Sequence, residues 1–182
     1  MIDKATYYLT PNAAGTSFTG TGYTPDGTIP ANAIPCTQEQ AQNFQAYAPS
    51  NGEIVSAPSA VLLAQAQTAQ KALVTQGYNT AIIAPISFTD TAGVADTYQA
   101  DSTSQQYLAR AVTGYRIAGG VPAGFYWRSA TNQNNAFTLA DLEGLYTAIL
   151  ARAEEDYQQL QTLKAQINAA TTASAVAAIV WP

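Results

Sequence analysis

The chain of 182 residues contains no histidine and a single cysteine, Cys36. One cysteine excludes an internal disulfide. Histidine is the usual ligand of zinc and iron and the usual base beside a serine or cysteine nucleophile, so its absence removes most metalloenzymes and every nucleophile–histidine mechanism. We therefore expect no metal, no cofactor and no catalytic residue, and a protein that is not an enzyme.

Charge is also scarce. Charged residues make up 10% of the chain, against roughly 25% in an average soluble domain. The seven basic residues are scattered and the net charge is −5, which argues against a nucleic-acid partner or an anionic membrane surface. No apolar run approaches the ~18 residues that a membrane span needs. No apolar core follows Met1–Lys4, so we expect no signal peptide and folding in a cytoplasm.

Hydrophobic residues make up 47% of the chain, enough for a sizeable core. With so few charges, the surface must be covered by threonine, glutamine, asparagine, serine and alanine. A surface with so few charges has little electrostatic repulsion to prevent association with other proteins. We interpret it as a sign that much of it contacts other protein.

Turn-forming residues dominate the first 36 positions and favour a small β-rich element, with strands at 7–9 and around Phe18 and Tyr23. Thr37 and Gln40 have the spacing of a capping box, which predicts a helix over 38–48. A turn at 49–52 and a short strand at 53–55 follow. Beyond them we expect a helix over 59–76 that stops at Gly77.

The second half alternates hairpins and helices. We expect a hairpin over 81–99, a helix from Asp101 or Ser102 through Tyr115 that ends at Gly119, and a second hairpin from Phe125 to Phe137. The Asn-rich turn at 131–135 is more typical of a hairpin loop than of a glycan contact.

A long helix is predicted over 139–170, with a short terminal helix over 173–179. Apolar residues recur in it every seven positions, as in a coiled coil. The two series are Leu139, Tyr146, Ala153, Leu160 and Ile167, and Leu142, Ile149, Asp156, Leu163 and Ala170. The two series together form one side of the helix, which we call the heptad seam. The heptad seam packs either on the chain's own hairpins or on another chain. Asp156 interrupts it, and either marks the end of the contact or pairs with Arg152.

The predicted fold class is α+β. A small N-terminal β-rich module with a short helix occupies 1–57, and a connecting helix occupies 58–80. The C-terminal module, 81–182, consists of two β-hairpins with a middle helix and the long heptad-patterned helix.

Candidate partner-binding residues lie on the seam and on the second hairpin. They are Leu139, Leu142, Tyr146, Ile149, Leu160, Leu163, Ile167, Trp127 and Arg128. An aromatic–arginine pair is typical of interface hot spots, although a core position for Trp127 is the more ordinary interpretation. The acids Glu154 and Glu155 point in different directions on a helix, so a solvated face is favoured over a glycosidase pair.

Several motifs occur in a fixed order from Ile86 to Trp181. They are Asp101–Ser104 with Tyr107–Leu108, Trp127–Asn132, Phe137–Leu142, Leu163–Ala170 and Trp181. In this order they resemble a phage-borne domain of unknown function found in tail-fibre and tail-fibre-assembly proteins. Thr131 departs from the family pattern, which more often has Asp there, and only a turn hydrogen bond depends on it. Shorter N-terminal pieces, such as Tyr7–Tyr8 and Ile29–Pro30, resemble the opening of tail-fibre assembly proteins.

The resemblance implies a chaperone-like role: helping a trimeric phage tail fibre to fold or assemble, or remaining at its tip as a cap. The partner would be a tail-fibre or baseplate protein, and the place of action the host cytoplasm during assembly, with retention in the virion tail left open. The alternative is a structural virion component, such as a fibre segment, connector or baseplate protein, which forms a homo-oligomer (a trimer) through the long helix.

Overall fold

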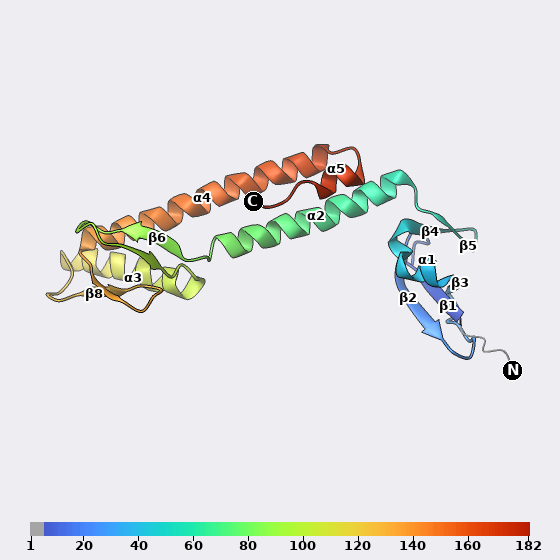
Figure 1. Cartoon of the computed structure of the whole chain (residues 1–182), viewed down its shortest axis with the longest axis horizontal. Helices are drawn as coiled ribbons and strands as arrows, with labels where there is room; N and C mark the ends of the chain where they lie inside the picture. Colours follow the sequence, from blue (N-terminus) through green and yellow to red (C-terminus); the bar gives the residue numbers. More distant parts are fainter. Residues whose placement is uncertain (1–5) are drawn as a thin grey trace. The chain divides into compact units, whose positions relative to one another are not determined.

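The structure is a computed structural model that describes residues 6–182, and its fold is α+β, as the sequence predicts (Figure 1). The expectation for Met1–Lys4 lies outside the described residues. The strands are β1 (Thr6–Pro11), β2 (Phe18–Thr24), β3 (Ile34–Cys36), β4 (Tyr47–Ser50), β5 (Glu53–Ser56), β6 (Ile86–Thr89), β7 (Ala95–Tyr98), β8 (Tyr126–Arg128) and β9 (Asn134–Ala136). The helices are α1 (Gln38–Gln42), the 3₁₀ helix η1 (Phe44–Ala46), α2 (Ser59–Ala81), α3 (Ser102–Ala118), α4 (Leu139–Ala169) and α5 (Ala173–Ala177).

The chain forms two compact units, which are described separately. The first unit consists of Met1–Ala69 and Ala170–Ala178, and the second of Gln70–Ala169 and Ile179–Pro182. The boundary between them falls inside α2. The division into 1–57, 58–80 and 81–182 therefore stays a prediction from the sequence.

The first unit is built on an antiparallel sheet in the order β2–β1–β3. Leu9 at the centre of β1 is fully buried, and Phe18 at the start of β2 is nearly so. Gly22 leaves room in β2 for the Tyr8 ring, whose outer end lies where a Cβ would stand. These contacts confirm the strands that the sequence predicts around residues 7–9, 18 and 23.

The capping box of α1 forms as predicted. The Gln40 backbone N–H donates to Thr37 Oγ1 at 3.1 Å, and the Thr37 N–H donates to Gln40 Oε1 at 2.9 Å. The prediction that this helix runs over 38–48 is wrong, because α1 ends at Gln42 and Tyr47 and Ala48 pair with β5. A residue before proline is biased toward extended backbone, and Ala48 precedes Pro49.

A tight hairpin joins β4 and β5. Asn51 and Gly52 both have positive φ, 52° and 82°, which is the backbone that a two-residue type I′ turn needs and that Asn-Gly adopts readily. In the same unit Thr172 caps α5 by accepting the Ala175 N–H at 3.1 Å, and Val176 is fully buried. The short terminal helix is thus present, two residues shorter than predicted.

The core of the second unit lies where α3 and α4 pack with the hairpins β6–β7 and β8–β9 (Figure 1). Its buried members are Tyr98, Ala100, Leu108, Val112, Phe137, Leu142, Leu145 and Ile149. Phe88, Tyr98 and Phe137 form an aromatic cluster at its centre, with ring centroids 5.2–6.3 Å apart. Aromatic rings at such separations bury large areas and fix the relative positions of the strands.

Capping residues define α3 as predicted. Asp101 Oδ1 accepts the N–H groups of Thr103 and Ser104 at 2.9 and 3.1 Å. Gly119 ends the helix in a left-handed conformation with φ 80°. The helix extends three residues beyond the predicted end at Tyr115.

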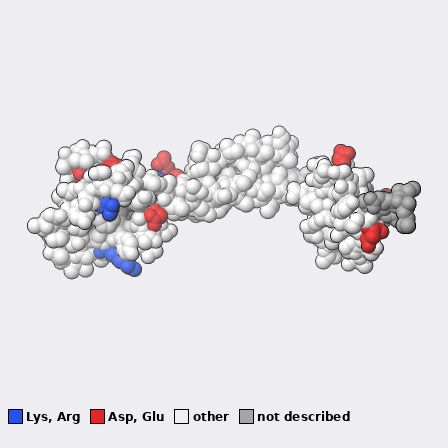
Figure 2. Space-filling view, turned by 60° about the horizontal axis from the view of Figure 1, so that its bottom comes forward, with Lys and Arg blue, Asp and Glu red and all other residues white. Residues whose placement is uncertain are grey.

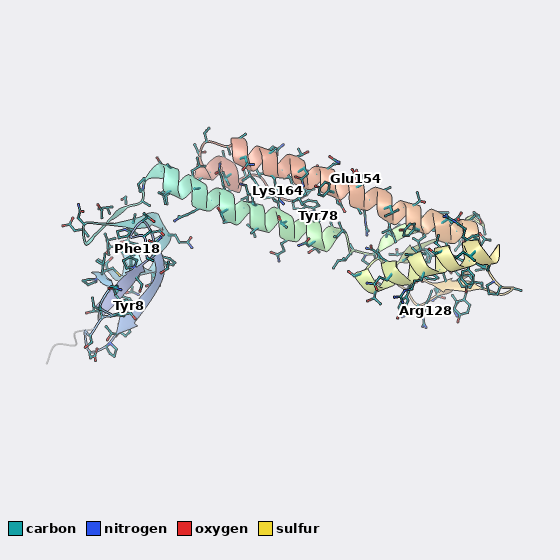
Figure 3. The ribbon with its side chains drawn as sticks, turned by 180° about the vertical axis from the view of Figure 1, so that it is seen from behind. Tyr8, Phe18, Tyr78, Arg128, Glu154 and Lys164 are labelled. Carbon is teal, nitrogen blue, oxygen red and sulfur yellow. The ribbon has the colours of Figure 1, made fainter. Side chains whose placement is uncertain are left out.

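The helix α2 does not stop at Gly77, so that prediction is wrong. It continues to Ala81, and Gly77 instead provides room for the Trp181 ring, which a Cβ would overlap. The Gln70 side chain holds the same tail by donating to the Ile179 carbonyl at 2.6 Å. Tyr78 faces α4 and lies edge-on to Trp181 and Tyr157, with centroids 6.1 and 6.4 Å away (Figure 3).

Candidate functional site

The heptad seam of α4 packs on its own chain. Five of its predicted partner-binding residues are at most 6% exposed: Leu142, Ile149, Leu160, Leu163 and Ile167. Leu139 and Tyr146 are half-buried, and Tyr146 packs on the core of the second unit. Partner binding through these seven residues stays a prediction, and their covered side chains offer little surface for it.

Asp156 does not pair with Arg152 as one alternative suggested. Arg152 instead donates to the carbonyls of Pro85 and Ile82 at 3.2 and 3.3 Å. Among residues 6–182 the one ion pair is Arg116–Glu143, at 2.8 Å on the surface. Exposed ion pairs of this kind contribute little to stability.

Trp127 and Arg128 alternate on β8, as neighbours on a strand do. Trp127 is half-buried and packs on the core beside Phe125, with ring centroids 6.4 Å apart, whereas Arg128 is exposed. The ordinary interpretation of Trp127 as a core-facing residue fits this position. Figure 3 shows Arg128 on the side of α3 away from α4.

A hydrogen-bond network fixes the loop after β8. Asp96 on β7 accepts hydrogen bonds from Asn135 Nδ2 at 3.0 Å and from the Thr97 N–H at 2.7 Å. The Thr131 hydroxyl donates a third, longer hydrogen bond to Asp96 at 3.3 Å. The bond from Asn135, followed by that from the Thr97 backbone, holds the pKa of Asp96 below its usual value. Thr131, the departure from the family pattern, therefore still makes a turn hydrogen bond.

Trp127 and Arg128 line a cleft of about 480 Å³ between β8 and the start of α3. We call it the aromatic cleft; its lining includes Ser104, Tyr107, Tyr126, Trp127, Arg128 and Asn132. Tyr107 and Tyr126 are 59% and 54% exposed. Helical spacing places Tyr107 on the same side of its helix as Leu108 and Val112, which predicts a covered position, and the structure leaves it exposed instead. Tyr126 lies on the first arm of the second hairpin, and only the fold brings the two tyrosines to Trp127.

A second hollow, of about 440 Å³, lies where the C-terminal tail crosses α2. We call it the tail hollow; its lining includes Leu73, Gly77, Ala81, Ala84, Trp181 and Pro182, and no charged residue. Leu73 is 57% exposed, and Val180, which precedes Trp181, is 61% exposed. Leu62, Ala66, Ala69 and Leu73 recur at spacings of four and three, which predicts that Leu73 lies on the covered face of its helix, and its exposure differs from that prediction.

The described residues hold no cluster of metal-ligating side chains. Within the same part of the chain, no helix has the length and apolar character that crossing a membrane requires. Burial raises the pKa of the half-buried Cys36 thiol, which makes it less reactive.

Comparison with known proteins gives one family. Residues 65–180 match the model of a domain of unknown function, DUF4376. No curated protein and no solved structure matches the chain. Because the matched segment is more than half of the chain, the protein belongs to the DUF4376 family.

Proposed function

We propose that this protein is a phage tail-fibre-associated protein that acts as an assembly chaperone or tip-bound cap for a trimeric tail fibre. The motif order from Ile86 to Trp181, on which the resemblance rests, falls almost entirely within the matched domain. The structural observation that carries the proposal is the tail hollow.

The tail hollow has the character of a protein-docking surface. Its apolar lining combines Leu73 from α2 with Trp181 and Pro182 from the tail, and Val180 adds a further exposed aliphatic side chain. Exposed apolar residues that gather in this way mark interaction sites, whereas scattered ones do not. Covering the exposed half of Leu73 or Val180 contributes about 1 kcal/mol each.

The weak charge of the surrounding surface suits the same role. Helix α2 carries one charged residue, Lys71, in 23 positions, and the face over α2 in Figure 2 shows neither blue nor red. A surface without charges can cover apolar segments of a partner without desolvating ions. The mechanism that we propose is transient cover: the chain binds apolar fibre segments and blocks wrong pairing until the trimer closes, in the host cytoplasm.

A structural role in the virion is the second candidate, and exposed residues on α4 favour it. Leu150 and Tyr157 are seven residues apart, and they are 52% and 46% exposed. This spacing places them on one side of the helix, beside the buried seam. Tyr157 contacts Tyr78 of α2 with part of its ring, and the exposed parts of Leu150 and Tyr157 could pack between copies of the chain in a trimer. Presence of the protein in purified particles at fixed stoichiometry, and a trimer in solution, would support this role.

Co-expression with the tail-fibre protein of the same phage tests the chaperone role. We expect trimeric fibre to increase when the protein is present, and Leu73→Glu with Val180→Glu to remove the increase, because charges in the tail hollow would have to be desolvated on docking. Val94→Glu is the matched control, since Val94 is 47% exposed on the β6–β7 turn. Fibre yield that does not depend on this protein would overturn the proposal.

A further inference from the structure

The aromatic cleft presents three rings from two elements. Tyr107 comes from α3, and Tyr126 and Trp127 come from β8. Both tyrosines are more than half exposed, so their ring surfaces are available to a ligand. The face of an aromatic ring is negative and attracts polarised C–H groups, such as those on the flat side of a pyranose.

Hydroxyl and amide groups make up most of the remaining lining. Gln99 and Asn132 contribute amides, Ser104 and Ser129 contribute hydroxyls that already bond to Asp101 and Thr131, and Ala130 is the one aliphatic residue. The three rings supply the apolar part of the lining, and the amides of Gln99 and Asn132 lie beside them. A ligand that is apolar on one face and carries hydroxyl groups around its edge would match both kinds of lining.

Arg128 is the one charged residue that lines the cleft. Its guanidinium makes no hydrogen bond or ion pair with any of residues 6–182. The nearest acids in the sequence are hydrogen-bonded and do not line the cleft: Asp96 accepts from Asn135, and Asp101 caps α3 and accepts from Ser104 Oγ at 2.6 Å. A free guanidinium beside a cleft without carboxylates selects an anion, and its planar fork fits a carboxylate best.

The wall of the cleft is held in place before any ligand arrives. Ser129 is 4% exposed, and its Oγ lies 2.8 Å from Thr131 Oγ1 and accepts the Gln133 N–H at 3.1 Å. Asn132 adopts a positive φ of 66° within this loop. A loop fixed in this way loses little conformational entropy on binding.

We propose that the aromatic cleft binds an oligosaccharide that carries a carboxylate group. The sugar rings stack on Tyr107 and Tyr126, the hydroxyls bond to the side-chain amides of Gln99 and Asn132, and Arg128 holds the carboxylate. This site is separate from the tail hollow and does not depend on the role in fibre assembly.

NMR titration of the full-length protein with two matched probes tests the site. Hyaluronan tetrasaccharide carries glucuronate, and the fully N-acetylated chitotetraose is its neutral counterpart. We expect the hyaluronan fragment to bind about tenfold more tightly, with shifts at the amides of Tyr107, Trp127 and Arg128. Arg128→Gln should remove that preference, whereas Lys164→Gln on α4 should keep it.

Two tyrosine variants locate the stacking surface. Tyr107→Ala and Tyr126→Ala should each weaken binding of both probes about fivefold to tenfold. Tyr157→Ala, an exposed tyrosine on α4, should not change it. Circular dichroism of all three variants should match the unchanged protein, because each tyrosine is about half exposed or more. Tyr157→Ala also removes a ring contact with Tyr78, so its melting temperature should fall slightly while its binding of both probes stays the same.

Three results would overturn the proposal. The first is equal affinity for both probes that Arg128→Gln leaves unchanged. The second is tighter binding of an acidic peptide to the same residues, which would assign the cleft to protein. The third is the absence of any shift in the cleft at about 10 mM of either probe, a concentration above the dissociation constant of even a weak specific site.

Discussion

Asp141 joins the start of α4 to the β6–β7 turn, and its removal should be costly. The carboxylate is 2% exposed. It accepts the Thr138 N–H at 2.7 Å, the Thr138 hydroxyl at 2.6 Å and the Thr91 N–H at 2.7 Å. The Asp141 N–H in turn donates to Thr138 Oγ1 at 3.2 Å, which completes a reciprocal cap.

We expect Asp141→Ala to lower the free energy of unfolding by about 3 kcal/mol. Each hydrogen bond to a charged group contributes about 1.5–3 kcal/mol, and the saved cost of burying the carboxylate offsets part of the sum. Urea denaturation followed by circular dichroism measures the change. Glu155→Ala is the control, because Glu155 is exposed on the same helix and its loss should stay within about 0.5 kcal/mol. A loss below about 1 kcal/mol for Asp141→Ala would refute this reasoning.

The same residue gives a pH dependence with a definite sign. Burial raises the pKa of Asp141, but the hydrogen bonds from Thr138 and Thr91 together lower it by more, so the net pKa lies below its ordinary value. The folded state therefore gains stability above the unfolded-state pKa of about 3.9 and loses it as the pH falls through the folded value. Asp141→Asn should remove this part of the acid sensitivity in urea titrations between about pH 5 and pH 2.

Two further substitutions test the packing. Gly77→Ala should displace Trp181, lower the free energy of unfolding by about 1–3 kcal/mol and shift the tryptophan emission to longer wavelength. The control Gly114→Ala lies in open space on α3 and should raise the free energy of unfolding by about 0.5–1 kcal/mol. Equal effects of the two substitutions would contradict the role of Gly77. Leu142→Ala, at a fully buried position of the seam, should lower the free energy of unfolding by about 2–5 kcal/mol. Leu150→Ala, at an exposed position of the same helix, should lower it by about 0.5 kcal/mol or less. Thermal melts distinguish the two variants, and a small effect of Leu142→Ala would place the seam outside the core.

The sequence predicts the ends of helices well where the capping residues lie within one helical turn of the end. The capping box at Thr37, the Asp101 cap and the Gly119 stop all involve residues within one turn of one another, and all three form. Gly77 shows the limit of such signals. A glycine stop and a glycine that makes room for a distant ring look the same in sequence, and only the position of Trp181 decides between them.

The heptad seam shows a second limit. Period seven reports that one side of α4 is buried, but not what buries it. Here Leu142 and Ile149 of the seam belong to the core of the second unit, and Leu142 and Ile167 are fully buried. The candidate sites are harder still to predict, since the aromatic cleft needs Tyr107 and Tyr126 to meet from two elements that are separated in the sequence.

We propose that the protein docks on a tail fibre through the tail hollow. Light scattering measures such docking directly, as an increase in mass. The absolute mass of the protein would be measured alone, with the purified fibre protein of the same phage, and again with the Leu73→Glu, Val180→Glu variant. We predict a defined complex with the fibre that the variant does not form and that Val94→Glu retains. A mass that the fibre leaves unchanged, or a complex that the variant forms equally well, would contradict the claim.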